Sequence, residues 1–459
     1  MKSVIKRKTC VTLIMLIVAA LLLSMVACSN SGSQTGKDEG TKNESQTENN
    51  GKDQESTGSD GDNVTLTLWT FADTHHRFFE YVRERFAEDH PNVTVNLELY
   101  DSDAMWDKLT VVMASGGDGA PDMADVEQGS FGRFVKNDTF FEPLNDYLEK
   151  AGKMDAISKG RQDLYTWEGK IYGLEHALCP VTMMYRKDIF EEKGIEVPLK
   201  TWDDFREAAK KLDDGQYMIG LGAAPLLRQD MVDIIYKSTG NDIVTMDGKI
   251  NINTQEYQDI IQMLWDFIYT DKIATTYEVD QDLWNLISDG KVVTYINADW
   301  GAGWLKDNCP DLSGKWSMTQ LPVMKEGDTP TSVRGGTGLT MLAVSKHKDL
   351  CWEFMQLAQL DVDSAVKRYE LTNLFPPLIE AFDDQRLYQP DPYFDGFVSA
   401  ELYRELGKIA PTQSPTWWRH LYYTAFEKFF FDMEEGKITA AEFAKKVEDE
   451  TKALIEENE

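Results

Sequence analysis

Apolar residues recur along the chain with two alternating periods. A strand with one buried face has an apolar residue at every second position, whereas a helix repeats every three or four residues. The two-residue period predicts strands over 64–69 and 93–99, and a further short strand is expected over 122–126. The helical period fills the gaps between them, at 78–86 and 109–114. This order predicts a β-α-β-α-β unit, and therefore a parallel sheet that is covered by helices.

The alternation continues through the rest of the chain. Further strands are expected over 181–185, 292–296 and 338–345. A helix is expected to begin after Thr201, whose side chain can cap the first turn, with Asp204 three residues later. Trp202 and Trp352 lie on apolar helical faces, so we expect both in the core. The folded body, about 64–459, is too long for one hydrophobic core and is expected to form two lobes.

The first 63 residues follow a different pattern. Basic residues at Lys2 and over 6–8 precede an almost wholly apolar run over 11–23. A membrane-spanning helix needs ~20 apolar residues, but this run is interrupted at Ser24. We therefore interpret 1–27 as an export signal peptide, with a retained membrane helix as the alternative.

The end of the apolar run, Met25-Val-Ala-Cys28, resembles a bacterial lipobox, in which a small residue precedes a cysteine that becomes lipidated. The resemblance implies that Cys28 carries a diacylglyceryl group, whose two acyl chains suffice for stable anchoring. Residues 28–63 are expected to form the lipidated cysteine and a disordered tether, because this polar segment cannot bury enough surface to fold. The predicted location is the outer face of the cell membrane of a Gram-positive bacterium.

Charge and cysteine content argue against several classes of function. A formal net charge of −31 argues against nucleic-acid binding, which needs clustered basic residues, and against docking on anionic lipids. The same charge keeps an exported protein soluble. The cysteines of the body, Cys179, Cys309 and Cys351, are odd in number and widely spaced. We therefore expect buried free thiols rather than a disulfide framework or a metal site.

Recognisable enzyme signatures are missing from the sequence. It contains no G-x-S-x-G, no G-x-x-x-x-G-K-[ST] and no H-E-x-x-H motif. His75 and His76 are adjacent and do not face one site on a helix, so we expect neither zinc nor another cofactor. A glycoside hydrolase with paired carboxylates stays open, because a chain with 78 acidic residues always offers such pairs.

Several segments together resemble one protein family. They are Leu68-Trp69 and 86–93, 121–126, 185–205, and 335–354. In this order they resemble the bacterial family 1 extracellular solute-binding proteins, and the resemblance extends over essentially the whole body. The segment 185–205 is the most specific of them, although Arg186 stands where the family usually has asparagine.

The resemblance implies an α/β protein with the type II periplasmic-binding-protein fold. In this fold two lobes enclose a ligand cleft and close around the ligand by a hinge motion. By analogy, lobe one is expected over 64–175 plus 318–365, and lobe two over 176–317 plus 366–459. The family also implies a monomeric receptor that passes a carbohydrate to the permease subunits of an ABC transporter.

The candidate ligand contacts follow from the chemistry of sugars and from the ends of the strands. A sugar needs aromatic rings for its C–H faces and polar planar groups for its hydroxyls. In open α/β lobes, ligands bind beyond the carboxyl ends of strands. Loops in these positions supply Trp69, Asp73, Glu127, Gln128, Asp299 and Trp300. The resemblance adds Gly335, Gly336, Trp417 and Trp418. Core packing or loop capping is the alternative role, and one of the two adjacent tryptophans is expected to pack inward.

Three functions stay open at this point. The first is a transport receptor that binds a carbohydrate, an oligosaccharide in particular, and does no chemistry. The second is a receptor of the same class for a non-sugar ligand such as a polyamine, whose site would also use tryptophans and carboxylates. The third is an exported carbohydrate-cleaving enzyme, which would degrade its ligand instead of holding it.

Overall fold

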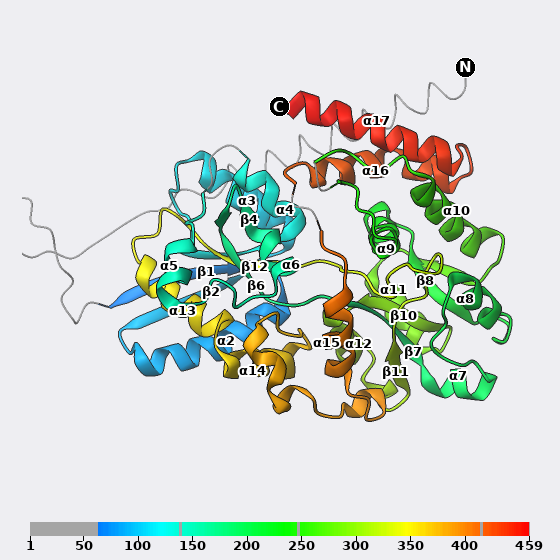
Figure 1. Cartoon of the computed structure of the whole chain (residues 1–459), viewed down its shortest axis with the longest axis horizontal. Coiled ribbons are helices and arrows are strands. Elements are labelled where there is room, and N and C mark those ends of the chain that lie inside the picture. Colours follow the sequence, from blue (N-terminus) through cyan, green and yellow to red (C-terminus); the bar gives the residue numbers. More distant parts are fainter. Residues whose placement is uncertain (1–62, 137–139, 246–247, 414–415, 459) are drawn as a thin grey trace, which may run out of the picture. The chain divides into compact units, whose positions relative to one another are not determined.

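Five strands form the sheet of the first lobe, on the left in Figure 1. In hydrogen-bonded order they are β2 (Val93–Leu99), β1 (Val64–Thr70), β3 (Met123–Glu127), β12 (Thr337–Met341) and β6 (Gly173–Glu175). β1 runs parallel to β2 and to β3, as the alternating periods predict. β12 is antiparallel to both of its neighbours. A strand from far along the chain therefore completes this sheet.

A second sheet of five strands forms the other lobe. Its order is β11 (Trp316–Thr319), β7 (Val181–Arg186), β10 (Val292–Ala298), β8 (Tyr217–Gly222) and β9 (Ala274–Tyr277). The strands β10, β8 and β9 are parallel, whereas β7 is antiparallel to β10 and to β11. The carboxyl ends of the three parallel strands therefore meet at one edge of the sheet, where ligands bind in folds of this kind.

The computed structural model describes residues 63–136, 140–245, 248–413 and 416–458. The signal peptide expected over 1–27, the lipidation of Cys28 and the tether up to residue 62 lie outside these residues. Among the described helices, none has both the length and the apolar character that are needed to span a lipid bilayer.

Helices cover both sheets (Figure 1). Those of the first lobe are α2 (Asp73–Asp89), α3 (Ser102–Ala114), α4 (Gln128–Val135), α5 (Asn145–Ala151), α6 (Lys159–Gln162), α13 (Lys348–Gln359) and α14 (Val362–Thr372). Those of the second lobe are α7 (Lys187–Lys193), α8 (Trp202–Ala209), α9 (Pro225–Ser238), α10 (Gln255–Tyr269), α11 (Asp280–Ser288), α12 (Asp299–Asn308), α16 (Arg419–Glu434) and α17 (Ala440–Asn458). The helix α15 (Ser399–Ile409) packs in a core cluster that residues of both lobes share.

Smaller elements connect these parts. A two-stranded hairpin consists of β4 (Thr166–Trp167) and β5 (Lys170–Ile171). Short 3₁₀ helices are η1 (Asp163–Tyr165), η2 (Pro310–Leu312), η3 (Ile379–Asp383), η4 (Gln385–Leu387) and η5 (Pro392–Phe394).

Several local predictions are confirmed. The side chain of Thr201 accepts a hydrogen bond from the backbone N–H of Asp204 at 3.1 Å, and the Asp204 carboxylate accepts from the Thr201 N–H at 3.0 Å. This reciprocal cap begins α8, as the sequence predicts. Trp202 and Trp352 are core residues, with 3% and 8% of their surface exposed. In the described part of the chain, the three cysteines are buried free thiols.

The strand expected over 338–345 is shorter and ends at Met341. Its partner β3 begins at Met123, which pairs with Met341. The residues after Met341 therefore have no residue of β3 to pair with. Leu342 instead forms an isolated bridge with Phe141. Because Leu342 is fully buried, the apolar run continues past the end of the strand, and the pattern alone predicts too long a strand.

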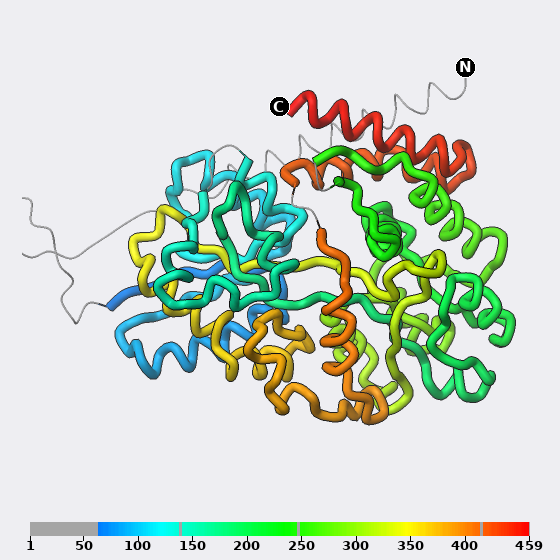
Figure 2. The backbone as a smooth tube through the Cα atoms, viewed as in Figure 1, coloured from blue at the N-terminus to red at the C-terminus, as the bar shows by residue number. Residues whose placement is uncertain are grey.

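The chain crosses between the two sheets several times, as the tube in Figure 2 shows. One crossing lies between β6 and β7, and a second lies between β11 and β12. The expected lobe boundary at 317/318 falls within β11, which pairs with β7 of the second sheet. The boundary at 365/366 falls within α14, which packs against α2 of the first lobe. We therefore propose later crossings, over about 320–336 and 373–378.

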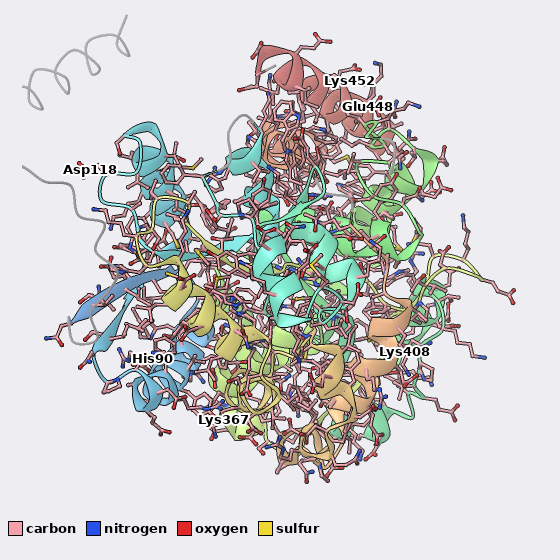
Figure 3. All side chains as sticks on the ribbon, turned by 60° about the vertical axis from the view of Figure 1, so that its left-hand side comes forward. His90, Asp118, Lys367, Lys408, Glu448 and Lys452 are labelled. Carbon is pink, nitrogen blue, oxygen red and sulfur yellow. The ribbon has the colours of Figure 1, made fainter. Side chains whose placement is uncertain are left out.

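The stability of the body rests on three buried apolar clusters. One belongs to the second lobe and one to the first, and the third includes strand residues of both sheets, such as Leu66 and Val292. Charged side chains cover the outside, as Figure 3 shows for Glu448 and Lys452 on α17. These two form an ion pair at 2.6 Å, but exposed pairs of this kind add little to stability.

Candidate functional site

A cavity of about 180 Å³ lies between the two lobes. We call it the cleft cavity. Its lining from the first lobe follows the carboxyl ends of β1, β3 and β6 and includes the turn before β12, whereas α12 contributes from the second lobe. The lining residues are Phe71, Ala72, Thr74, His75, Glu127, Glu175, His176, Ala177, Cys179, Trp300, Trp304, Gly335, Gly336, Thr337 and Leu374. Four of the ten predicted ligand contacts are among them, namely Glu127, Trp300, Gly335 and Gly336.

Two tryptophans form the aromatic wall of the cleft cavity. Trp300 and Trp304 lie one turn apart on α12, with ring centroids 4.7 Å apart at an angle of 64°. The Trp300 indole N–H donates to the backbone carbonyl of Arg334 at 3.3 Å, and the Arg334 guanidinium lies 4.8 Å from the Trp300 ring centre. Trp304 is 38% exposed. The hydrogen-bonded indole of Trp300 and the exposed indole of Trp304 together offer the apolar faces that a sugar ring needs.

The turn Gly335-Gly336 forms the floor of the cleft cavity next to β12. Both residues have left-handed φ angles, +69° and +142°, and a Cβ on Gly336 would lie only 2.2 Å from a guanidinium nitrogen of Arg161. Arg161 donates to Oε2 of Glu175 at 3.0 Å and to the Gly335 carbonyl at 3.1 Å. Both charged side chains are buried. This buried pair fixes the turn, and its close approach requires glycine.

Glu127 both lines the cleft cavity and caps α4. Its Oε2 accepts from the backbone N–H groups of Gly129 at 2.7 Å and Ser130 at 3.1 Å. Burial raises the pKa of Glu127, although these two bonds favour its ionised form. A carboxylate offers about four acceptor sites. The capped carboxylate therefore keeps acceptor capacity for a ligand hydroxyl.

Two histidines and an aspartate lie at the base of the cleft cavity, and in the described part of the chain only His75, Asp125 and His176 are grouped closely enough to hold a metal ion. Gln359 accepts from Arg368 through Oε1 at 2.6 Å, so its Nε2 faces Nδ1 of His176 at 2.9 Å. His176 therefore accepts at Nδ1 and donates from Nε2 to Asp125 at 2.7 Å. This chain of bonds explains the cluster without a metal.

The second histidine has a different role in the cluster. Nδ1 of His75 lies 3.1 Å from Asp125, and the Thr70 hydroxyl donates to the same carboxylate at 2.7 Å. Burial opposes ionisation of Asp125, but His176 and His75 hold its pKa below the usual range. Burial also lowers the pKa of His176 to about 4. Nδ1 of His75 thus donates to an ionised carboxylate, and the residue also lines the cleft cavity.

Asp299, a predicted ligand contact, is fully buried and holds backbone segments together instead. Its Oδ2 accepts from the N–H groups of Cys179 at 3.4 Å and Phe375 at 3.0 Å, and its Oδ1 accepts from the N–H of Trp300 at 2.8 Å. Cys179 and Phe375 belong to two different crossings between the lobes. Burial raises the pKa of Asp299 to about 7, although the three N–H groups oppose this shift.

The remaining predicted aromatic contacts lie outside the cleft cavity. Trp69 is 2% exposed and has the Lys108 ammonium 4.1 Å from its ring centre. Trp418 is 5% exposed and belongs to the core of the second lobe. Trp417 is partly buried, with the Lys136 ammonium 3.4 Å from its ring centre. One of the two adjacent tryptophans therefore packs inward, as the sequence predicts.

The two remaining polar predictions also have other contacts. Asp73 begins α2 with 78% of its side chain exposed, 3.5 Å from Arg77. Gln128 is hydrogen-bonded to Gln413. For these residues, and for Trp69, Asp299, Trp417 and Trp418, a role in ligand binding stays a prediction.

Several cavity residues were not expected from the sequence. Trp304 stands four residues after Trp300, so helical spacing could have placed both on one face. Phe71 directly follows β1 and satisfies the rule about strand ends. Glu175 is the last residue of β6, and His176 follows it. This strand has only three residues. A strand this short shows no periodicity, so the sequence carries no signal for these two positions.

Residues 82–394 match the family of bacterial extracellular solute-binding proteins. The chain belongs to this family. Its members bind solutes outside the cytoplasm, so the chain acts at an extracytoplasmic location. An arabinooligosaccharide-binding protein of Halalkalibacterium halodurans is 29% identical over 76% of this chain and 79% of that protein. A protein of the same description from Bacillus subtilis is 26% identical over 75% of this chain and 80% of that protein.

Solved structures confirm the predicted two-lobed α/β fold. The galacto-N-biose-/lacto-N-biose I-binding protein of Bifidobacterium longum, in complex with lacto-N-biose, superposes with a TM-score of 0.72 at 21% identity and covers 87% of this chain and 98% of its own. An ABC substrate-binding protein of Listeria monocytogenes, in complex with cycloalternan, reaches a TM-score of 0.70 at 20% identity and covers 86% of this chain and 99% of its own.

Proposed function

We propose that this protein binds a carbohydrate in the cleft cavity and delivers it to the permease of an ABC importer. The observation that carries the proposal is the pairing of the Trp300–Trp304 wall with polar groups across the same cavity. The indoles suit the C–H faces of a sugar ring, while Glu127 offers acceptor capacity for its hydroxyls and His75 adds a polar ring to the lining. Both lobes contribute to the lining, so a bound sugar would favour their closure.

The ligand that we propose is an oligosaccharide. Two of the relatives are described as arabinooligosaccharide-binding proteins, and a third, from Rhizobium radiobacter, as a lactose-binding protein with 26% identity over 72% of this chain and 79% of that protein. An arabinooligosaccharide is therefore the first ligand to test.

We propose further that the ligand stays intact. A glycosidase uses two carboxyl groups that flank the bond to be cleaved. In the cleft cavity, Glu175 is paired with buried Arg161 and Glu127 is engaged in capping α4. Both carboxylates are therefore engaged in structural contacts. This arrangement agrees best with a receptor that does no chemistry.

Thermal-shift measurements test the ligand class. The panel contains arabinotriose, lactose, maltotriose, L-arabinose and spermidine. A ligand at one hundred times its Kd stabilises the folded state by about 2.7 kcal/mol, which raises the melting temperature measurably. We expect arabinotriose or another saccharide of the panel to do so. A shift with spermidine and with none of the saccharides would contradict the carbohydrate assignment.

Mass spectrometry of the saccharide after a day with catalytic amounts of protein tests the absence of chemistry. We expect the intact saccharide at its starting concentration. Shorter products would identify the chain as an enzyme.

We propose that the protein is anchored to the cell membrane through Cys28. The motif Met25 to Cys28 supports this proposal, and residues 28–62 would then connect the anchor to the body. Replacing Cys28 by serine is expected to abolish metabolic labelling with palmitate, because serine offers no thiol for lipidation. The matched control is Cys10→Ser within the signal peptide, which should be labelled normally. Unchanged labelling of the Cys28 variant would contradict the proposal.

A further inference from the structure

A second cavity, of about 130 Å³, lies in the second lobe and is more enclosed than the cleft cavity. We call it the lobe-two cavity. Its walls come mainly from β8, β10, α9 and α11. Trp304 lines both cavities, and Arg334 lines the lobe-two cavity while the next residue, Gly335, lines the cleft cavity. The two cavities are therefore neighbours on either side of these residues.

A hydrogen-bonded series of side chains forms the polar wall of the lobe-two cavity. Arg334 is paired with the Asp230 carboxylate and donates from Nη1 to Oδ1 of Asn297 at 2.9 Å. Asn297 in turn donates to the Tyr295 hydroxyl at 2.5 Å. The Trp300 ring holds the Arg334 guanidinium from another side. Because these groups are fixed before a ligand arrives, contacts with ligand hydroxyls cost little ordering entropy.

The other walls are aromatic and aliphatic. They include Tyr277, Leu227 and Trp284, whose ring meets the Tyr295 ring edge-on at 5.3 Å. Arg334 is paired with Asp230, and Asp280 adds an exposed carboxylate to the lining. Charged groups beside aromatic rings suit a ligand with hydroxyls and C–H faces. One water needs roughly 10–15 Å³ of such space. A cavity of about 130 Å³ therefore has room for several waters, or for one sugar ring in their place.

We propose that the lobe-two cavity receives the terminal unit of a carbohydrate chain, while the adjacent unit lies on Trp300 and Trp304 in the cleft cavity. The protein then recognises chain ends and needs a ligand of at least two units. This inference rests on the proposed carbohydrate-binding function and adds to it the length of the ligand and the part that is recognised. A monosaccharide would fill only one of the two spaces.

The variant Leu227→Trp tests the inference, because Leu227 lines the lobe-two cavity from α9 and is not among the residues that line the cleft cavity. The larger side chain is expected to fill the lobe-two cavity. Leu226→Trp is the matched control, since Leu226 is the adjacent residue on the same helix and is 57% exposed. We expect the calorimetric Kd for arabinotriose to rise at least about ten-fold in Leu227→Trp and to stay within about two-fold in Leu226→Trp. The wild type should bind L-arabinose at least about ten-fold more weakly than arabinotriose.

A second variant, Asp230→Asn, retains the size of the cavity and removes the charge pair with Arg334. It is expected to weaken arabinotriose binding about three- to ten-fold, and it decides the question if Leu227→Trp does not melt cooperatively. If the wild type binds no saccharide of the panel, the proposed function itself fails. If the wild type binds arabinotriose and the folded variants bind it equally well, or if L-arabinose binds as tightly, only the chain-end inference is overturned.

Discussion

Replacing Trp300 by alanine is expected to raise the Kd for arabinotriose about ten- to one-hundred-fold. Stacking of a flat ligand on an aromatic side chain contributes on the order of 1–3 kcal/mol, by analogy with bases on aromatic rings. Trp300 also contacts the Arg334 guanidinium and donates to the Arg334 backbone carbonyl, so its loss also removes support from a residue that lines the lobe-two cavity. Isothermal titration calorimetry of the purified body measures the effect.

The unliganded fold should tolerate this change, because Trp300 is only partly buried. Trp352→Ala is the control, since Trp352 is a core residue with 8% exposure and truncation of such a residue costs ~3–5 kcal/mol of stability. The apo melting temperature should therefore fall strongly for Trp352→Ala and only slightly for Trp300→Ala. If Trp300→Ala melts as low as the control and binds arabinotriose normally, Trp300 serves packing and not ligand binding.

Replacing Asp299 by alanine is expected to destabilise the protein by at least ~3 kcal/mol. The change leaves three buried backbone N–H groups without their acceptor, and an unsatisfied buried group costs ~1–3 kcal/mol. Because these groups belong to α12 and to two lobe crossings, the loss should also affect how the lobes are held. Urea unfolding measures the difference.

The control for this variant is Asp383→Ala, whose side chain is 90% exposed. A surface change of this kind typically alters stability by no more than ~0.5 kcal/mol. Equal unfolding midpoints for the two variants would show that the buried carboxylate contributes no more than an exposed one.

Asp299 should also make stability depend on pH. Burial raises its folded-state pKa to about 7, above the value of about 3.9 in an unfolded chain. The folded state therefore binds the proton more tightly. Its contribution to stability is fully present below about pH 4 and is lost as the pH rises through about 7.

The variant Asp299→Asn cannot titrate and isolates this contribution. Between about pH 4 and 7 the wild type should lose unfolding free energy relative to the variant, by a few kcal/mol in total. Denaturant unfolding at several pH values gives the two curves. Parallel curves across this window would contradict the raised pKa. The comparison holds although other groups titrate, since they are common to both proteins.

Local patterns in the sequence were sufficient for much of the fold. Local apolar patterns predicted β1, β2, β3, β7 and β10 to within two residues at each end. Alternation marks a half-buried strand, and a short apolar run marks a strand that is buried on both faces. The reciprocal cap of α8 was also predictable, because the two residues that form it, Thr201 and Asp204, lie within one helical turn. The rule that ligands bind beyond the carboxyl ends of strands led to Glu127 and Trp300.

Only the tertiary structure decided which residues at the strand ends face a cavity. Trp69 and Trp300 both lie at or just after the end of a strand, but Lys108 of α3 packs over Trp69, whereas Trp300 stands on the cleft side of α12. Asp299 precedes Trp300 and yet turns inward to the crossings. Apolar periodicity indicates which residues are buried, but it does not indicate which helix covers a given residue.

Contacts between distant segments could likewise not be predicted from the sequence. His75 and His176 are 101 positions apart. They meet at Asp125 because β1, β3 and β6, whose ends they follow or adjoin, belong to one sheet. The lobe-two cavity depends on Arg334, a residue just before β12, whose guanidinium extends to Asp230 of the other lobe. The sequence by itself determined the class of the protein and its family, because both are recorded in local motifs. The shape of the site depended on tertiary packing, because long-range pairing of segments brings its polar groups together.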